Sequence, residues 1–167
     1  MAETRLLIDE KKLTYSGLIP VQGVYTVVKT FLQENDYDPF DSRNEEQVFE
    51  DGKQIILEIK GEKKLSEFAR INWETKFYFT NLQEMFVERE GKKLRLHQGK
   101  VVFQTDVFLL TDYEQTFEQN AFQHFLRILI DKYVFKSYMN RNVDLVMKHY
   151  KQFEEKIKRY LNMEAFK

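Results

Sequence analysis

The sequence predicts an α+β protein in which a curved antiparallel sheet of five or six strands packs on a long C-terminal helix, with another helix near the N-terminus. Three observations predict this class. Apolar residues recur at the helical period over 21–34, follow a strand-like meander over 47–111, and return to the helical period over 117–138 and 142–162. The 167 residues contain no internal repeat, low-complexity tract or flexible linker, so we expect a single domain.

The N-terminal helix is indicated by one apolar stripe with the spacing of a 3.6-residue period, formed by Val21, Val24, Tyr25, Val28 and Leu32. Pro20 suits the first turn of this helix, because its ring fixes φ near the helical value. The segment 35–39 ends in proline, and residues before proline avoid the helical region, so the helix should end there. The preceding segment, 5–13, is compatible with a short strand and with an extended arm.

The middle of the chain has the pattern of strands joined by tight turns. The Asp-Gly pair at 51–52 predicts a hairpin, since the turn needs a positive φ that glycine adopts readily. Over 69–79 apolar and polar residues alternate, which is typical of an antiparallel strand with one buried and one solvated face. We expect two short strands within 85–96, joined by a turn at 90–92, and a last strand that begins at Gly99.

The C-terminal third is predicted to be helical. Residues 116–119 have the form of a capping box, and the run 121–135 is apolar around most of its circumference. The helix over 117–138 should therefore be the central one. A second helical segment follows a break at 140–142, and its narrow apolar seam consists of Val143, Val146, Tyr150, Phe153, Ile157 and Tyr160. Packing on its own chain is the favoured use of this seam, and self-association is the alternative.

Composition excludes several classes of protein. The chain is 43% hydrophobic and 32% charged, and no apolar run approaches the roughly 20 residues of a membrane-spanning helix. It has no cysteine, which excludes disulfides, thiol catalysis and zinc sites built on cysteine. The N-terminus lacks a basic region followed by an apolar one, so we expect no secretory signal and a cytoplasmic location.

The net charge of −1 conceals an uneven distribution of charge. Residues 34–51 contain eight acidic side chains and one basic side chain, whereas residues 127–167 contain ten basic and five acidic ones. These two regions could pair within a chain or between chains, and two separately solvated faces are the favoured interpretation. Basic and aromatic residues also interleave over 132–141, but the local excess is too small to favour a nucleic-acid partner.

Few residues combine into a known catalytic or metal-binding pattern. The histidines, His97, His124 and His149, lie more than twenty residues apart and form no zinc motif. No serine lies in a nucleophile elbow, and no glycine-rich phosphate loop occurs, so we expect no metal and no cofactor. Asp106 stands out on an otherwise apolar strand, and the carboxylates within 112–118 are explained by capping of the following helix. An enzyme therefore ranks third among the functional hypotheses.

The order of elements resembles the helix-grip fold of the START-like superfamily. It has a short first strand, a helix, an antiparallel meander and a long apolar C-terminal helix. The resemblance covers most of the chain and includes no motif, so it carries over no ligand residue. It implies a sheet wrapped around the last helix with an apolar cavity between them. Members mostly bind lipids, polyketides or other hydrophobic molecules, and some are hydrolases, cyclases or chaperone partners. This chain departs from the pattern by having one clear helix before the meander, where two are usual.

Two hypotheses from different classes follow. The first is a binding protein for a hydrophobic small molecule, held in a cavity between the sheet and the helix over 117–138 and lined by Trp73, Phe77, Phe103, Val107, Phe125 and Leu129. The alternative is an interaction module, either a homodimer or an assembly subunit, that uses the basic C-terminal helix against a protein or nucleic acid. Its surface would consist of Lys136, Tyr138, Arg141, Lys148, Lys151, Lys158 and Arg159.

Overall fold

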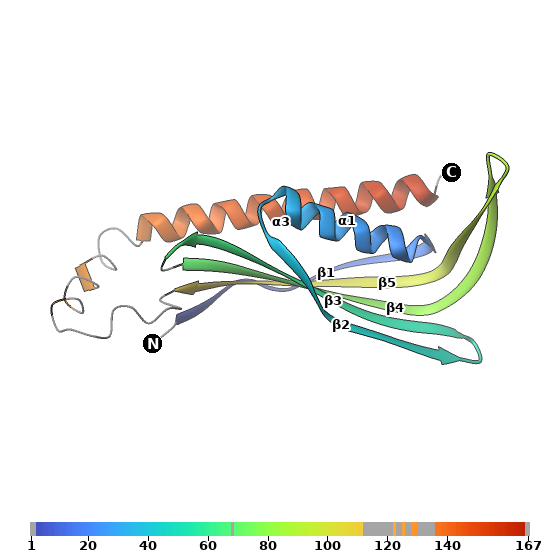
Figure 1. The fold of residues 1–167 in the computed structure, drawn as a ribbon, viewed down its shortest axis with the longest axis horizontal. Coiled ribbons are helices and arrows are strands. Elements are labelled where there is room, and N and C mark those ends of the chain that lie inside the picture. Colours follow the sequence, from blue (N-terminus) through green and yellow to red (C-terminus); the bar gives the residue numbers. More distant parts are fainter. Residues whose placement is uncertain are drawn as a thin grey trace.

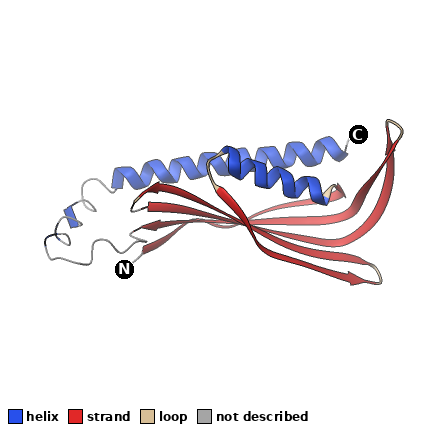
Figure 2. Ribbon diagram, in the orientation of Figure 1, coloured by secondary structure: helices blue, strands red, loops and turns tan. Residues whose placement is uncertain are grey.

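The structure, a computed structural model, describes residues 3–67, 69–111 and 136–165 together with Phe122, Phe125, Ile128 and Leu129. Figure 1 and Figure 2 show a long curved sheet with two helices over one face. The elements in chain order are β1 (Glu3–Ile19), α1 (Val21–Glu34), β2 (Asp38–Phe49), β3 (Gly52–Ser66), β4 (Ala69–Arg89), β5 (Lys92–Thr111) and α3 (Lys136–Ala165). The predicted fold class, an α+β protein with a curved antiparallel sheet, is confirmed.

The five described strands form one antiparallel sheet in the order β1-β5-β4-β3-β2. After β1, the chain crosses to the opposite edge of the sheet through α1. It then returns strand by strand, so that β5 pairs with β1. This connection places α1 across the sheet, next to α3, and both helices contribute to the hydrophobic core.

Strand β4 follows the predicted alternation over its first half. Ala69, Ile71, Trp73, Phe77 and Phe79 are all buried on the helix-facing side, while the residues between them are half-buried on the other side. This alternation arises because successive side chains of a strand point to opposite faces. The helix-facing side of β4 therefore forms the centre of the core.

Helix α1 begins and ends where the sequence predicts. Val24, Val28, Phe31 and Leu32 are buried against the sheet, and Pro20 directly precedes the helix. The chain leaves the helix through Asn35, and the following residue has a positive φ of 62°. The helical period of the apolar residues was thus sufficient to locate this element.

Helix α3 runs without a break from Lys136 to Ala165, so the predicted break at 140–142 is wrong. Asn142 is buried, and Val146, Tyr150, Phe153 and Ile157 of the predicted seam all pack into the core. The favoured use of the seam, packing on its own chain, is what the structure has. The burial of the seam shows that α3 covers the sheet. Most of the segment 117–138, predicted to be the central helix, lies outside the described residues.

A cluster of aromatic rings fills the space between the sheet and the two helices. The Trp73 ring lies 5.8 Å from Phe31, 5.7 Å from Tyr37 and 5.5 Å from Phe153, measured between ring centroids. Its indole N–H donates a hydrogen bond to the Thr75 hydroxyl at 2.9 Å. Tilted and edge-on ring pairs at such separations stabilise the folded state beyond the contribution of the buried apolar area. Trp73 is therefore the centre of a packed aromatic core.

The sheet bends where β4 and β5 pass beyond the helices. Asn81 has a φ of 54°, and the register between β4 and β5 shifts between Thr80 and Gln83. A Cβ atom at Gly99 would lie 2.9 Å from a Leu82 methyl carbon and from the Thr80 carbonyl oxygen, so this β-bulge requires glycine opposite it. The short strands expected within 85–96 are the distal parts of β4 and β5. The predicted turn between them is present at Glu90 and Gly91.

The two edge strands are longer than the sequence indicates. The segment 5–13, left open between a strand and an arm, lies within β1. The meander begins at Asp38 rather than at 47, because 38–46 pairs with β3 although its residues do not alternate and are mostly exposed.

Within the described residues, neither helix has an apolar stretch that would let it cross a bilayer.

Candidate ligand pocket

A pocket of about 370 Å³ lies on the helix-facing side of the sheet, between the first turns of α1 and the outer strands β2 and β3. Its described lining consists of Val21, Gln22, Tyr25, Asp41, Arg43, Asn44, Glu46, Ile55, Leu57, Glu58 and Ile59. The pocket lies where the sheet extends past the N-terminal end of α1. It is the candidate functional site.

The floor of the pocket is apolar. Ile55, Leu57 and Ile59 alternate along β3, and their pairing with Phe79, Phe77 and Thr75 of β4 places them on the helix-facing side. Leu57 and Ile59 are buried, whereas Ile55 is half-buried at the open end. Val21 of α1 adds an apolar wall. An apolar floor of this kind suits the hydrocarbon part of a ligand.

The rim of the pocket carries a hydrogen-bonded group of polar side chains. The Tyr25 hydroxyl lies 2.7 Å from both carboxylate oxygens of Asp41, and the Lys29 ammonium donates to the Tyr25 hydroxyl at 2.9 Å. Lys29 also pairs with Asp41 at 3.5 Å. The hydrogen bond with Tyr25 is the main cause that raises the pKa of Lys29. These contacts hold the Asp41 carboxylate at the pocket entrance as a hydrogen-bond acceptor.

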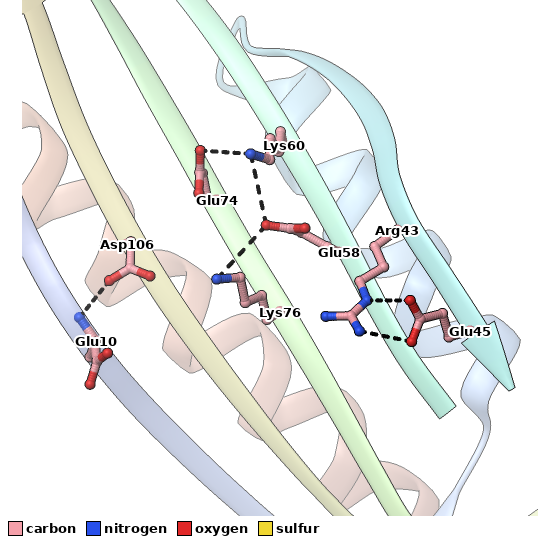
Figure 3. Close-up of polar contacts among 8 residues, drawn as sticks. All are labelled: Glu10, Arg43, Glu45, Glu58, Lys60, Glu74, Lys76 and Asp106. Carbon is pink, nitrogen blue, oxygen red and sulfur yellow. Dashed lines mark hydrogen bonds and ion pairs between the residues drawn. The ribbon is translucent and has the colours of Figure 1, made fainter. Parts of the chain in front are cut away.

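A β-bulge in β2 directs Asp41 toward α1. The register with β3 shifts between Asp41, which pairs with Ile59, and Arg43, which pairs with Glu58. The shift restores Arg43 to the opposite face of the sheet, where its guanidinium forms two hydrogen bonds of 2.8 Å with Glu45 (Figure 3). This pairing lowers the pKa of the Glu45 carboxyl. The bulge therefore directs Asp41 toward α1, while Arg43, which also lines the pocket, pairs with Glu45.

The outer face of the sheet carries cross-strand ion pairs. Lys60 lies 3.0 Å from Glu74 and 3.8 Å from Glu58, and Lys76 lies 4.0 Å from Glu58 (Figure 3). The hydrogen bond from Lys60 to Glu74 raises the pKa of the lysine. These side chains lie on neighbouring strands and compensate each other's charge. They are explained by sheet stability, as cross-strand pairs of opposite charge usually are.

Asp106, the carboxylate singled out in the sequence, has a structural role. Its oxygen accepts a hydrogen bond of 2.6 Å from the backbone N–H of Glu10 (Figure 3). Glu10 has a φ of 42° and lies where the register between β1 and β5 shifts. Asp106 therefore satisfies a backbone donor that the bulge in β1 removes from the strand ladder.

The residues predicted to line a cavity fall into two groups. Trp73, Phe77, Phe103 and Val107 are fully buried in the core, where the Phe77 and Phe103 rings lie 5.4 Å apart. Phe125 and Leu129 are 59% and 40% exposed and do not belong to the core cluster. The structure brings the first four together beneath the helices and does not bring the last two to them.

The predicted interaction surface lies along the outside of α3. Lys136, Arg141, Lys148, Lys151, Lys158 and Arg159 are exposed, and Tyr138 is half-buried against the core. Asp144 and Glu155 line the same surface groove as Lys148 and Lys151. The helix therefore presents mixed charge. The acidic stretch and the basic tail also meet within the chain, where Lys156 of α3 pairs with Glu34 of α1.

Two of the three histidines lie in the described part of the chain, and His124 lies outside it. His149 is buried on α3, with its Nδ1 atom 3.1 Å from the Tyr37 hydroxyl. Burial lowers the pKa of both His149 and His97, and neighbouring lysines lower that of His149 further. Among the described residues, no three histidine, aspartate or glutamate side chains form a group that could hold a metal ion.

The pocket could not be located from the sequence, although several of its lining residues belong to patterns noted there. Tyr25 belongs to the apolar stripe of α1, and Asp41 belongs to the acidic stretch 34–51. Neither pattern indicates that the two side chains meet. A signal that could have located the rim is a hydroxyl-bearing aromatic within an otherwise aliphatic helix stripe, because a buried tyrosine hydroxyl needs a polar partner.

Together, the fold and the pocket define an α+β protein with a small concave site beside its first helix. In comparisons with known proteins, the chain matches no family model and is significantly similar to no curated protein sequence. The resemblance to the START-like superfamily therefore rests on the order of elements alone.

Proposed function

We propose that the protein binds a small, mainly hydrophobic molecule in the pocket between α1 and strands β2 and β3. The observation that carries the proposal is a pocket of about 370 Å³ with an apolar floor and a polar, charged rim. This size lies within the range of sites for small ligands. The proposal keeps the ligand class expected from the sequence and moves the site from the sheet–helix core to the pocket beside α1.

The rim favours a ligand whose polar end donates hydrogen bonds. Asp41 and Glu46 offer carboxylate oxygens, and Asn44 and Gln22 offer amide carbonyls. An anionic head would meet three carboxylates, those of Asp41, Glu46 and Glu58, and one guanidinium, that of Arg43, which is already paired with Glu45. We infer a ligand with an apolar body, which would pack on Ile55 and Leu57, and a neutral or cationic end that carries N–H or O–H groups.

The density of the aromatic core supports this location over the one first expected. A cavity under α3 would need space beside Trp73 and Phe103, but both side chains are fully buried. Phe31 and Phe153 pack within ring-contact distance of Trp73. A ligand there would have to displace these rings, whereas the pocket beside α1 requires no such displacement.

A fluorescent probe with the inferred chemistry tests the proposal. N-phenyl-1-naphthylamine is neutral, apolar and carries one N–H donor, and its emission rises in an apolar site. We expect saturable binding of one probe per chain. The substitution Ile55→Trp, which would fill the open end of the pocket, should weaken binding at least tenfold.

The neighbouring residue provides a matched control. Ile56 pairs with Tyr78 on the opposite face of the sheet, so Ile56→Trp changes the same strand without entering the pocket. It should leave probe affinity unchanged. Absence of saturable binding to the wild-type chain, or equal binding by the two tryptophan variants, would overturn the proposal. Native mass spectrometry of the freshly purified protein would in addition give the mass of any retained ligand.

A further inference from the structure

Two hairpin ends carry exposed apolar side chains beyond the helices. We call residues 82–99 of the β4–β5 hairpin the distal arm and residues 45–54 of the β2–β3 hairpin the outer tip. Phe86 in the distal arm and Val48 in the outer tip are each 70% exposed, and Phe49, Met85 and Leu94 are 48%, 44% and 39% exposed. Figure 1 shows both hairpins extending past the two helices at the same end of the molecule.

The distal arm is a ribbon of only two strands for most of its length. The pairing of β3 with β4 ends at Leu82, and that of β1 with β5 ends at His97. Beyond these points β4 and β5 pair only with each other, as far as Arg89 and Lys92. A two-stranded ribbon is marginally stable without further packing. Packing against a partner surface would therefore stabilise the distal arm.

Both faces of the distal arm present exposed apolar side chains. Met85 pairs with Leu96, and Val87 pairs with Leu94, so these four side chains lie on one face, where Met85 and Leu94 are exposed, Val87 is half-buried and Leu96 is buried. Phe86 pairs with Arg95 and is exposed on the other face. Exposed apolar groups of this kind can mark interaction surfaces. The outer tip offers a second apolar patch, formed by Val48 and Phe49.

The charges around the two patches have opposite signs. The distal arm has four basic and three acidic side chains, and its basic ones are concentrated in residues 89–95, which contain one acidic side chain. The outer tip has four acidic side chains and one basic side chain, Lys53, which pairs with Glu46 and with Glu84 of the distal arm. Complementary potentials of this kind determine which surfaces associate and in what register.

We propose that a second copy of this chain occupies these surfaces, with the distal arm of each copy seated on the outer tip of the other. Both surfaces lie at one end of the molecule, so a single two-fold axis beyond that end brings both arm–tip pairs together. Such an arrangement closes after two copies, as most homo-oligomers do. An anionic membrane fits less well, because its charge would attract the distal arm but repel the outer tip. The dimer does not depend on the proposed ligand.

A charge exchange on the full chain tests the proposal. The arm variant carries Lys92→Glu and Lys93→Glu, and the tip variant carries Glu50→Lys and Asp51→Lys. In sedimentation velocity runs the wild-type chain should form dimers. Each variant alone should dimerise at least tenfold more weakly, because like charges then face each other across both contacts. A mixture of the two variants should form dimers again, because each contact regains opposite charges.

The outcomes of this experiment distinguish a second copy of the chain from an anionic membrane as the partner of these surfaces. Recovery in the mixture would establish reciprocal arm–tip contacts. At a protein concentration low enough to keep all three chains monomeric, the thermal midpoints of both variants should match that of the wild type, since the four changed residues are exposed. A wild-type chain that remains monomeric at every concentration would overturn the proposal. So would variants that dimerise as well as the wild type, a mixture that fails to recover, or a monomer that binds vesicles of anionic phospholipid through the distal arm.

Discussion

The same two strands, β4 and β5, differ in burial between their covered half and their distal arm. Under the helices, Trp73 and Phe77 of β4 are fully buried. Past the bend at Asn81, Phe86 of the same strand is 70% exposed. Both halves contain aromatic and β-branched residues and both are paired as strands. The difference comes from the helices, which cover the first half only, so the contribution of a strand residue to stability depends on its position relative to the bend.

The largest expected effect of this difference is on the free energy of unfolding when an aromatic side chain is replaced by alanine. Trp73→Ala removes a ring that contacts Phe31, Tyr37 and Phe153, and it should destabilise the protein by about 3–5 kcal/mol. In the monomer, Phe86→Ala should change the unfolding free energy by less than about 0.5 kcal/mol, because the ring is already in water. Urea unfolding followed by circular dichroism measures both. Comparable losses would show that the distal arm is packed in the folded monomer.

The second effect concerns the bend that divides the two regions. Gly99→Ala would place a methyl group 2.9 Å from the Thr80 carbonyl oxygen, and backbone atoms cannot move aside cheaply. We expect a loss of about 1–3 kcal/mol, as for other overpacked sites. Gly91→Asn at the arm's turn is the matched control, since a Cβ atom there meets nothing within 4 Å and asparagine tolerates a positive φ.

Hydrogen exchange would show where the damage from Gly99→Ala falls. Amides of the distal arm should lose protection first, whereas those of the covered half should keep it. Equal loss of protection throughout the sheet would mean that the bend is part of the same cooperative unit as the core.

The contrast also explains which elements the sequence predicted. The residues of α1 and the first half of β4 lie against the core, so their apolar positions follow the helical or strand period. For that reason the bounds of α1 and the buried face of β4 could be predicted correctly. Asp51 and Gly52 identified a hairpin turn because turn geometry depends on local conformation alone.

Elements outside the core could not be predicted in the same way. Strand β2 is exposed along nearly its whole length, and its pairing with β3, not any alternation, makes it a strand. The bulge at Asn81 breaks the alternation of β4, so the distal arm was predicted as separate short strands. The candidate pocket combines Tyr25 of α1 with Asp41 of β2, and only the tertiary structure brings these residues together.

A smaller effect should distinguish the two described histidines as pH falls. Burial lowers the pKa of His149 from its usual value of 6.5, so the folded protein keeps the ring neutral while the unfolded chain protonates it. The unfolded state then binds more protons, and the unfolding free energy falls as pH drops below about 6.5. The Nδ1 atom lies 3.1 Å from the Tyr37 hydroxyl, so a change in the protonation of the ring would also affect this buried hydrogen bond.

His149→Asn tests this account, because the side chain of asparagine cannot titrate yet offers a polar atom near the position of Nδ1. Denaturant unfolding between about pH 7 and about pH 5 should show a shallower fall in stability for the variant than for the wild type. His97→Asn should flatten the fall less, since His97 lies at the base of the distal arm and is only half-buried. An unchanged slope for His149→Asn would mean that other groups cause the acid sensitivity.

The smallest expected effect is a difference in coupling energy between one ion pair of the covered half and one of the distal arm. Double-mutant cycles measure both coupling energies. Lys60 and Glu74 lie on the outer face of the covered half, with side chains 31% and 21% exposed, whereas Arg95 of the arm's pair with Glu84 is 58% exposed. Exposed pairs contribute about 0.2–1 kcal/mol, and less as salt screens them. We therefore expect a coupling energy for Lys60 and Glu74 near the top of that range, and one for Glu84 and Arg95 near its bottom. If the arm's pair were the stronger, a neighbouring surface would have to shield it from water. In a dimer that buries the distal arm its coupling should accordingly rise with protein concentration, while that of Lys60 and Glu74 stays constant.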